Sequence, residues 1–275
     1  QNTLQKTGYD FVGWNTAADG SGTSYKPGDK ITLQESIILY AQWEPKDTTG
    51  YIVEHWQQQL DGTYNKVEDE PKSGRTDSSV TANTKNYTGY VYNPNHAESK
   101  AEGVILADGS LVLKLYYDRA TYTVTYDLDG GSSSEKLVYP DLKYGEDTPK
   151  LSADPEKPGH TFLGWNPTIE PTVTGNVTYI AKWNKIPYSI TYQWAPNTPQ
   201  EVRDKFSVPV DSKEYFYGEP YTISAESYQP VEIVDDYGNV TDRYTFNGWD
   251  TKDGTVTGNI LVTGSWNHEE VKISE

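Results

Sequence analysis

GYDFVGW, residues 8–14, is the stretch that decides the fold of this chain of 275 residues, because similar stretches follow it twice. The later copies are GHTFLGW at residues 159–165 and RYTFNGW at residues 243–249. Each copy is followed by a short segment that ends in a second tryptophan: LYAQW at 39–43, YIAKW at 179–183 and VTGSW at 262–266. Such self-similarity predicts a series of small repeated modules rather than one large domain.

The residues that open the two later copies alternate in the manner of half-buried strands. In residues 122–126 (YTVTY) and 188–192 (YSITY), two tyrosines and a central Val or Ile share one face, and Thr or Ser residues share the other. Only seven residues precede the Gly-Tyr of the first copy, so no such opening strand is present there. We expect residues 1–44 to be a partial module whose first strand lies upstream, or a shorter piece that leans on the next module.

A stretch of another type separates the first two copies. Residues 51–56 (YIVEHW) and 111–117 (LVLKLYY) have the pattern of strands. The Asp108-Gly109 pair lies between residues 104–106 and 111–113, and it predicts a hairpin there because Gly accepts the positive φ of such turns.

The linkers are short and are not flexible Gly/Ser tethers. We expect modules at residues 1–44, 50–119, 121–184 and 187–267, held end to end in an elongated and fairly stiff array. A short helix is predicted near residues 199–206, because Thr198 can cap it, Pro199 suits its first turn and Glu201 follows three residues after the cap. A second helix candidate is residues 133–137.

The composition predicts a mostly β fold. Tyr and Gly are abundant at 23 residues each, and long runs of Ala, Leu, Glu and Lys at helical spacing are missing. The chain has no Cys, which excludes disulfides and thiolate metal sites. Small modules without these links must be stabilised by buried aromatic rings and by contacts with their neighbours.

The repeated tryptophans are expected to be structural. In an unbroken strand Phe11 and Trp14 would point to opposite faces, so we expect a bulge at Gly13 that brings Trp14 inward. The expected structural positions are Tyr9, Phe11, Gly13, Trp14, Trp43, Phe162, Gly164, Trp165, Trp183, Phe246, Gly248, Trp249 and Trp266. Trp56 and Trp194 lie outside the paired motif and are the better candidates for an exposed platform that binds a ligand.

These motifs resemble known families of repeats. The Gly-Tyr-x-Phe-x-Gly-Trp block followed by Tyr-Ala-x-Trp resembles the internalin-type B repeat (Listeria-Bacteroides repeat) in residues 1–44 and 121–184. Residues 50–119 look like a mucin-binding-protein (MucBP-like) repeat, and residues 187–267 resemble the streptococcal high-identity repeat in tandem (SHIRT). These resemblances imply extracellular repeats of Gram-positive surface proteins, with β-grasp-like α+β modules in which strands flank a short helix, and no enzyme.

Several kinds of site find no support in the residues. The net charge of −17 argues against nucleic acid, and no apolar run is long enough for membrane insertion. The four histidines, His55, His96, His160 and His268, are scattered and form no metal or nucleophile motif. We therefore expect no catalytic residues, no cofactor and no bound metal, and residues 127–131 and 19–22 are interpreted as Asp-Gly turns rather than calcium loops.

Lys114 and Lys182 lie inside apolar strands, and surface stalks sometimes carry Lys-Asn isopeptide bonds. The alternation of these strands favours outward-pointing lysines instead.

The expected function is that of a non-catalytic stalk, which presents an adhesive or other head away from the bacterial cell wall. A cell-wall-anchored extracellular parent protein and a monomeric state are expected. The alternative is direct adhesion, in which a module, foremost residues 50–119, binds mucin glycans or a host protein. A hydrolase is the third alternative, supported only by carboxylates whose spatial separations the sequence does not give.

Overall fold

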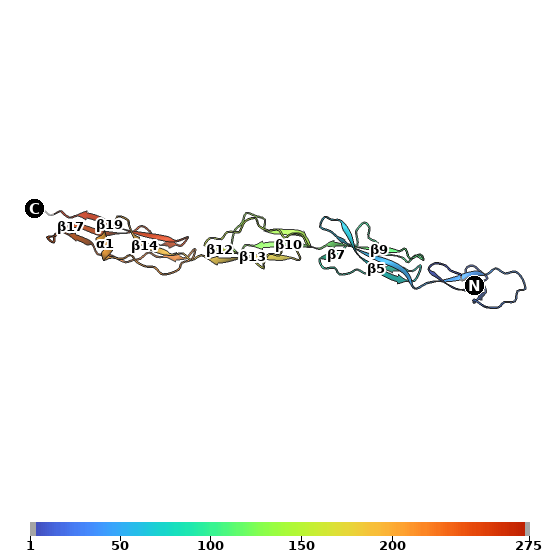
Figure 1. Cartoon of the computed structure of the whole chain (residues 1–275). Coiled ribbons are helices and arrows are strands. Elements are labelled where there is room, and N and C mark those ends of the chain that lie inside the picture. Colours follow the sequence, from blue (N-terminus) through green and yellow to red (C-terminus); the bar gives the residue numbers. More distant parts are fainter. Residues whose placement is uncertain (1–3, 273–275) are drawn as a thin grey trace. The chain divides into compact units, whose positions relative to one another are not determined.

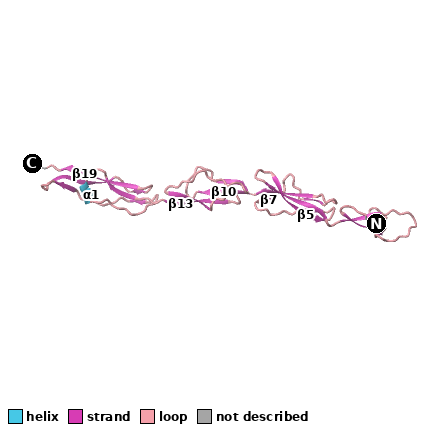
Figure 2. Ribbon diagram, viewed as in Figure 1, coloured by secondary structure: helices cyan, strands magenta, loops and turns pink. Residues whose placement is uncertain are grey.

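The computed structural model describes residues 4–272, and it is built almost entirely of strands (Figures 1 and 2). Strands hold 46% of the residues and helix 2%, which confirms the mostly β fold and the tandem array of β repeats. The chain divides into two compact units. The first comprises Gln1–Val124, Val138–Pro149 and Glu170–Val177, and the second comprises Thr125–Leu137, Lys150–Ile169 and Thr178–Glu275. No helix of the described residues is long and apolar enough to cross a membrane.

The first sheet carries the first copy of the aromatic motif. Its strand order is β2-β1-β3, with β1 at Tyr9–Asn15, β2 at Ser24–Tyr25 and β3 at Tyr40–Pro45. β1 and β3 run antiparallel, and Phe11 lies opposite Trp43. The motif and its closing tryptophan therefore lie on adjacent strands of one small sheet.

The second sheet is mixed and has the order β5-β4-β9-β7. β4 (Thr49–Gln58) pairs antiparallel with β5 (Tyr64–Gly74) and parallel with β9 (Val112–Arg119), while β7 (Tyr90–Tyr92) closes the other side of β9. The predicted strands at 51–56 and 111–117 are confirmed as parts of β4 and β9. The inward residues of these strands, Val53, Leu113 and Leu115, form one core with Ile105, and each of the four is at most 2% exposed.

The hairpin predicted around Asp108-Gly109 is wrong. A turn does form there, since the Gly109 N–H donates to Leu106 O at 2.9 Å and Gly109 has φ +75°. However, the strand before it, β8 (Glu102–Val104), pairs with β6 (Ser79–Thr81) in a separate two-stranded sheet. β9 pairs with β4 and β7 instead, and the segments before and after the turn meet in an isolated antiparallel bridge between Lys100 and Lys114.

The third sheet has the order β11-β10-β13-β12. Its strands are β10 (Thr121–Asp127), β11 (Val138–Lys143), β12 (His160–Asn166) and β13 (Val177–Lys185). The predicted opening strand is confirmed as β10, with Val124 and Tyr126 at most 2% exposed. When only the strands of each sheet are counted along the chain, the second and third sheets share one order: second, first, last, third.

The fourth sheet has the order β14-β19-β17-β16. Its strands are β14 (Ile190–Trp194), β16 (Val231–Val234), β17 (Val240–Trp249) and β19 (Ile260–Glu270), and a separate pair joins β15 (Pro220–Tyr221) to β18 (Gly254–Thr255). β14 runs parallel to β19, as β4 does to β9. In the second to fourth sheets, the last strand of the sheet thus lies between its first and its third strand.

The helix near residues 199–206 is present as α1 (Gln200–Lys205), but its expected cap is wrong. Pro199 occupies the cap position, no side chain bonds to the free N–H groups, and the buried Thr198 hydroxyl has no hydrogen-bond partner. Residues 133–137 form no helix. There the Glu135 carboxylate accepts hydrogen bonds from the Ser152 and Ala153 N–H groups at 2.7 and 3.1 Å, which holds the segment in a loop. Among the described residues α1 is the one helix, so the helices implied for the modules at 50–119 and 121–184 are replaced by loops.

Candidate functional site

The aromatic motif forms the same ring cluster in three sheets. In the first sheet Phe11 meets Trp14 and Trp43 edge to face, with ring centroids 5.4 and 5.6 Å apart. Phe162 meets Trp165 and Trp183 at 5.2 and 5.4 Å, and Phe246 meets Trp249 and Trp266 at 5.2 and 5.4 Å. Five of these six contacts are edge to face and the Phe246–Trp266 pair is tilted. Because such ring pairs are favourable at this distance, each trio links the motif strand to the closing strand.

The bulge predicted at Gly13 is confirmed, and it recurs in the other copies. The register between paired strands shifts between Phe11 and Gly13, between Phe162 and Gly164, and between Phe246 and Trp249. The bulge glycines have φ values of +149°, +109° and +93° for Gly13, Gly164 and Gly248. Side chains rarely adopt such backbone angles, which explains the Gly that precedes each motif tryptophan.

Trp194 is not an exposed platform, which corrects that expectation. Its side chain is 7% exposed and lies in a core with Val202, Val231 and Trp266. The indole stacks on Trp249 with ring centroids 5.4 Å apart and an interplanar angle of 6°, and its N–H donates to Phe206 O at 3.1 Å. The period-two pattern places Trp194 on the same face as Ile190 and Tyr192, and α1 covers that face.

Trp56 lies at one end of a stack of aromatic rings and is half-buried. Tyr116 lies between Trp56, at 5.8 Å and 18°, and His96, at 3.7 Å and 7°. The Trp56 N–H donates to Glu54 at 3.3 Å, and the Lys114 ammonium lies 5.8 Å from the Trp56 ring. Whether Trp56 binds a ligand stays a prediction. Lys182, for which the strand pattern favours an outward-pointing side chain, is exposed on β13.

Three glycines that stand immediately before strands were not identified as important from the sequence. Gly8, Gly89 and Gly159 directly precede β1, β7 and β12, and their φ values are +77°, +80° and +69°. The signal was available in the sequence, since Thr-Gly-Tyr occurs at both 7–9 and 88–90 and Pro-Gly-His at 158–160. We call the region around each of these glycines a junction, because the chain passes there from one sheet to the next.

Each junction glycine accepts a hydrogen bond from the linker that leaves its sheet. The N–H groups of Lys46, Ala120 and Ile186 donate to the carbonyls of Gly8, Gly89 and Gly159, each at 2.9 Å. These linkers are brief: β3 ends at Pro45 and β4 begins at Thr49, and β9 ends at Arg119 and β10 begins at Thr121. The same bond therefore anchors the linker at every passage from one described sheet to the next.

A residue of the next sheet region covers the open face of each junction glycine. Built methyl groups at Gly89 and Gly159 would overlap the side chains of Tyr144 and Tyr217, and one at Gly8 would lie 2.7 Å from the Ala107 main chain. Real side chains essentially never approach so closely. Positive φ and lack of space thus require Gly at these places for two independent reasons.

The first junction is reinforced by side-chain bonds. The Thr76 hydroxyl donates to Gly8 O at 2.7 Å, and the Thr76 N–H donates to Lys46 O at 2.9 Å. The Tyr9 hydroxyl donates to Asp77, and the Asp77 carboxylate raises the pKa of this hydroxyl. Arg75 pairs with Asp47 in the linker at 3.1 Å.

The second junction is reinforced by an arginine. Arg119 donates to Gln58 O at 3.0 Å and to Tyr144 O at 2.6 Å, and its guanidinium lies 5.4 Å from the Tyr90 ring. The Tyr144 N–H donates to Ala120 O at 2.8 Å. One cation therefore joins the end of β4, the start of β7 and the loop after β11.

The second sheet also encloses a buried polar network around His55, which is 0% exposed. Tyr117 accepts a hydrogen bond from the Lys85 N–H at 3.0 Å, so its own proton is free to reach His55 Nδ1 at 2.9 Å. His55 Nε2 then donates to Glu70 at 2.8 Å. Hydrogen bonds from Lys72 and His55 lower the pKa of Glu70 to about 2. Every polar atom of this network is satisfied, as the interior requires.

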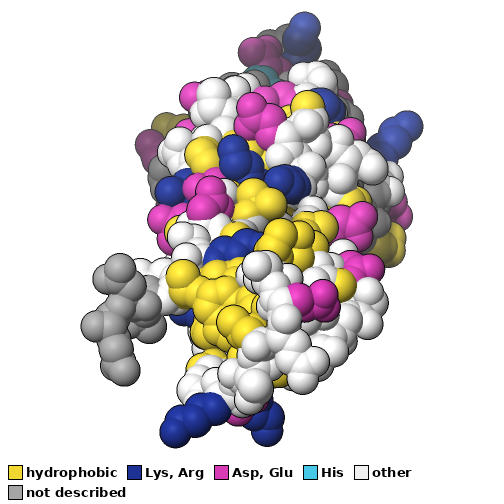
Figure 3. Space-filling view, turned by 90° about the vertical axis from the view of Figure 1, so that its right-hand side faces the viewer, with side chains coloured by type: hydrophobic (Ala, Val, Ile, Leu, Met, Phe, Trp, Pro, Cys, Tyr) yellow, Lys and Arg dark blue, Asp and Glu magenta, His cyan; other side chains and the backbone are white. Residues whose placement is uncertain are grey.

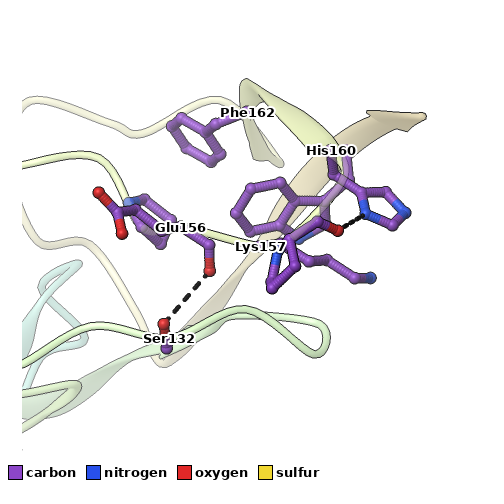
Figure 4. Close-up of a pocket in the computed structure, with 8 residues that line it drawn as sticks. Ser132, Glu156, Lys157, His160 and Phe162 are labelled. Carbon is purple, nitrogen blue, oxygen red and sulfur yellow. Dashed lines mark hydrogen bonds between the residues drawn. The ribbon is translucent and has the colours of Figure 1, made fainter. Parts of the chain in front are cut away.

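A shallow pocket of about 400 Å³ lies beside the third junction (Figure 4). Ser132, Lys157 and His160 line it, and each bonds to a main-chain carbonyl: Glu156 O at 3.4 Å, Asp129 O at 2.9 Å and Pro158 O at 2.7 Å. None of these contacts forms the nucleophile–base pair that covalent catalysis needs. The described residues contain no group of three His, Asp or Glu side chains that could hold a metal ion.

The two Asp-Gly stretches form turns. Asp19 accepts hydrogen bonds from the Ser21 N–H and hydroxyl at 3.0 and 2.6 Å, and Asp127 accepts one from the Asp129 N–H at 2.9 Å. These bonds lower the pKa of Asp19. Their carboxylates thus stabilise the loop itself, in agreement with the turn interpretation.

Comparison with known proteins identifies a family of repeats in two stretches of the chain. Residues 1–42 and 122–184 match the family model of the Listeria-Bacteroides repeat domain. A protein of Evansella cellulosilytica named "Putative Gly-rich membrane protein" is 25% identical over 97% of this chain and 30% of its own length. A second protein of that organism, "Putative membrane protein", is 26% identical over 91% of the chain and 35% of its own length. The chain thus spans about a third of the length of these relatives.

Among solved structures, the chain is similar to one titled "Streptococcal High Identity Repeats in Tandem (SHIRT) domains 3-4 from cell surface protein". The likeness covers 55% of this chain and all of that one, at 16% identity and a TM-score of 0.22. A score this low carries no argument about the fold.

Proposed function

We propose that this chain is a spacer region of a bacterial cell-surface protein, which holds another part of its parent protein away from the cell wall. The repeated junction carries the proposal: three successive passages between sheets use a positive-φ glycine, a bond from the linker to its carbonyl, and a covering residue. A protein that needed only flexible tethers would gain nothing from three such matched contacts.

The geometry of the junctions supports stiffness. Fixing the glycine carbonyl to the linker N–H removes the freedom of the chain at the point where a hinge would otherwise lie. The residue that covers each glycine then occupies the space beside it. Modules held in this way behave as a quasi-one-dimensional array, in which each contacts only its neighbours.

Several observations support a non-catalytic, extracellular role. The family that matches residues 1–42 and 122–184 is a repeat family, and the relatives are named as membrane proteins. The polar groups of the pocket in Figure 4 are bonded to main-chain carbonyls rather than to one another. We propose a monomeric spacer in a cell-wall-anchored Gram-positive protein, with modules at residues 1–44, 50–119, 121–184 and 187–267.

Small-angle scattering of the whole chain tests the proposal. A compact globule of this length has a radius of gyration of about 19 Å. A stiff array predicts a value well above that, together with a distance distribution that ends in a long tail. A radius close to the compact value would contradict the spacer role.

Direct adhesion is a second candidate function, favoured by the half-buried Trp56 at the end of its ring stack. A platform of this kind can hold a sugar ring or a peptide side chain. Screening immobilised mucin glycans and extracellular host proteins tests this candidate. Binding that is lost in Trp56→Ala and kept in Tyr237→Ala, which removes an aromatic side chain that is 91% exposed, would support it. Absence of binding to either panel would remove it.

A further inference from the structure

Two shallow hollows adjoin one another on the loops beside the third sheet. The first, of about 400 Å³, is the pocket of Figure 4. The second, of about 390 Å³, is lined by residues 132–135, 153–154 and 156. Ser132 and Glu156 line both hollows, so the two form one groove, and all of its lining residues belong to the second compact unit.

Main-chain bonds join the two loops that form the groove. The Ser132 N–H donates to Glu156 O at 2.7 Å, and the Glu156 N–H donates to Ser132 O at 3.0 Å. The Glu135 carboxylate accepts hydrogen bonds from the N–H groups of residues 152 and 153. The walls are therefore held in place without a ligand, which lowers the conformational cost of binding one.

Aromatic rings line the first hollow. Phe162, His160 and Trp183 are half-buried there, and Figure 4 shows how Phe162 and His160 lie around it. In the fourth sheet the closing tryptophan, Trp266, is 7% exposed and stacks on Phe206 with ring centroids 5.9 Å apart. The ring trio of the fourth sheet is thus sealed, whereas that of the third sheet is open to the groove.

The second hollow is polar. The Asp154 and Glu156 side chains are exposed, and within residues 4–272 neither carboxylate has a hydrogen-bond or ion-pair partner. The Glu135 N–H donates to the Ser133 hydroxyl oxygen at 3.1 Å, so the proton of this hydroxyl is available to a ligand. The groove thus offers two free carboxylate acceptors and a hydroxyl donor next to a set of open rings.

These polar and aromatic groups together select the chemistry of the ligand. The groove is not a continuous apolar surface, unlike the face at the right of Figure 1, where Figure 3 shows hydrophobic side chains gathered together. A wholly apolar ligand would leave the two carboxylates without partners, and an anionic ligand would be repelled by them and by the net charge of −17. A neutral sugar has a C–H face that packs on aromatic rings and hydroxyl groups that donate to carboxylates.

We propose that this groove binds a neutral oligosaccharide. One sugar ring packs against Phe162 and Trp183 in the first hollow, and the next ring donates its hydroxyl protons to Asp154 in the second. Glu156, which lines both hollows, accepts hydroxyl protons from either ring. The site adds a binding function to the spacer role, which itself requires no ligand, and it is separate from Trp56, which lies in the other compact unit.

Titration of the whole chain with neutral oligosaccharides tests the proposal. The probes are linear tetramers of glucose, of mannose, of galactose and of N-acetylglucosamine, and the charged comparators are tetramers of glucosamine and of galacturonic acid. We expect calorimetry to show saturable binding of at least one neutral probe and weaker binding of both charged comparators. Binding should also shift the emission of Trp183 to shorter wavelength, which is measured as the difference between the parent chain and Trp183→Phe.

Side-chain variants place the bound sugar in the groove. Glu156→Ala and Asp154→Ala each remove a charged hydrogen-bond acceptor and are expected to weaken binding of the neutral probe by about tenfold. The matched control is Glu214→Ala, which removes an exposed carboxylate outside the groove and should leave affinity within about twofold. Urea unfolding of the three variants should match that of the parent chain, because none of these side chains has a bonded partner among the described residues.

Three results would overturn the proposal. The first is no binding of any neutral probe at any soluble concentration. The second is stronger binding of the glucosamine tetramer than of every neutral probe, which would show that negative charge alone attracts the ligand. The third is an affinity for the neutral probe that changes no more in Asp154→Ala or Glu156→Ala than in Glu214→Ala. Scattering tests the spacer role independently of all three.

Discussion

Replacing the junction glycine Gly89 by alanine is expected to destabilise the second sheet by more than its backbone angle alone would. Gly89 has φ +80°, and its missing side chain leaves room for the Tyr144 ring. Gly62, in the turn between β4 and β5, has φ +88° and open space around it. Gly62→Ala in the same sheet region is therefore the matched control for the backbone contribution.

The two contributions can be estimated separately. A left-handed backbone costs an alanine about 1–2 kcal/mol, of which part is offset because alanine also restricts the unfolded chain. We therefore expect Gly62→Ala to cost about 1 kcal/mol. Forcing a methyl group against a packed ring adds about 1–3 kcal/mol, so Gly89→Ala is expected to cost about 2–4 kcal/mol.

Urea unfolding of the whole chain, followed through the transition of the second sheet, measures both free-energy changes. The decisive variant is Tyr144→Ala, which removes the ring that the new methyl group meets. In that background Gly89→Ala should cost no more than Gly62→Ala does, which gives a coupling energy between positions 89 and 144. Equal costs for the two glycine variants in the parent chain, or no relief from Tyr144→Ala, would refute the reasoning.

Other outcomes follow from single contacts. Gly164→Ala should lower the free energy of unfolding by about 1–2 kcal/mol, measured by calorimetry, because Gly164 has a φ of +109°. No atom lies within 4 Å of the added methyl group, so the cost comes from the backbone alone. An unchanged melting temperature would argue against the bulge. Because the folded pKa of Glu70 is lowered to about 2, its stabilisation is complete above its ordinary value near 4.5 and is lost as pH falls from there toward 2. Glu70→Gln should flatten that acid limb of a pH titration of stability, and an identical limb would contradict the assignment. His55→Ala should cost about 2–4 kcal/mol by urea unfolding, because it leaves Tyr117 and Glu70 without their buried partner, and a cost below 1 kcal/mol would show that the network contributes little. Emission of Trp194 should be blue-shifted and protected from a neutral quencher, as a difference spectrum with Trp194→Phe would show, and a quenchable component from this residue would contradict its burial.

The aromatic trios were predictable from the sequence because a regular strand cannot place both aromatic rings of the motif on one face, whereas a strand with a bulge can. Phe11 and Trp14 fall on opposite faces of a regular strand, and a glycine stands between them. The bulge at Gly13 places both rings against Trp43. The local sequence was sufficient here, because the two rings and the glycine that forms the bulge lie within four residues.

Features that depend on distant partners were not predictable in the same way. The Asp108-Gly109 turn forms, but the pairing of β8 is decided by β6, more than twenty residues earlier in the chain. Trp194 lies outside the repeated pair, yet α1 and Trp249 bury it. The junction glycines were visible as Thr-Gly-Tyr and Pro-Gly-His, but their role depends on Tyr144 and Tyr217, which no local pattern connects to them.

The measurement that tests the spacer role most directly is the distribution of distances across one junction. Cysteines introduced at Val67 on β5 and Val138 on β11, which are 46% and 48% exposed, allow nitroxide labels on either side of the Gly89 junction in a chain with no other Cys. A fixed junction predicts one narrow distribution by pulsed electron spin resonance, and a broader one in Gly89→Ala. A broad distribution in the parent chain, unchanged by Gly89→Ala, would show that the junction is a hinge and would contradict the proposed function.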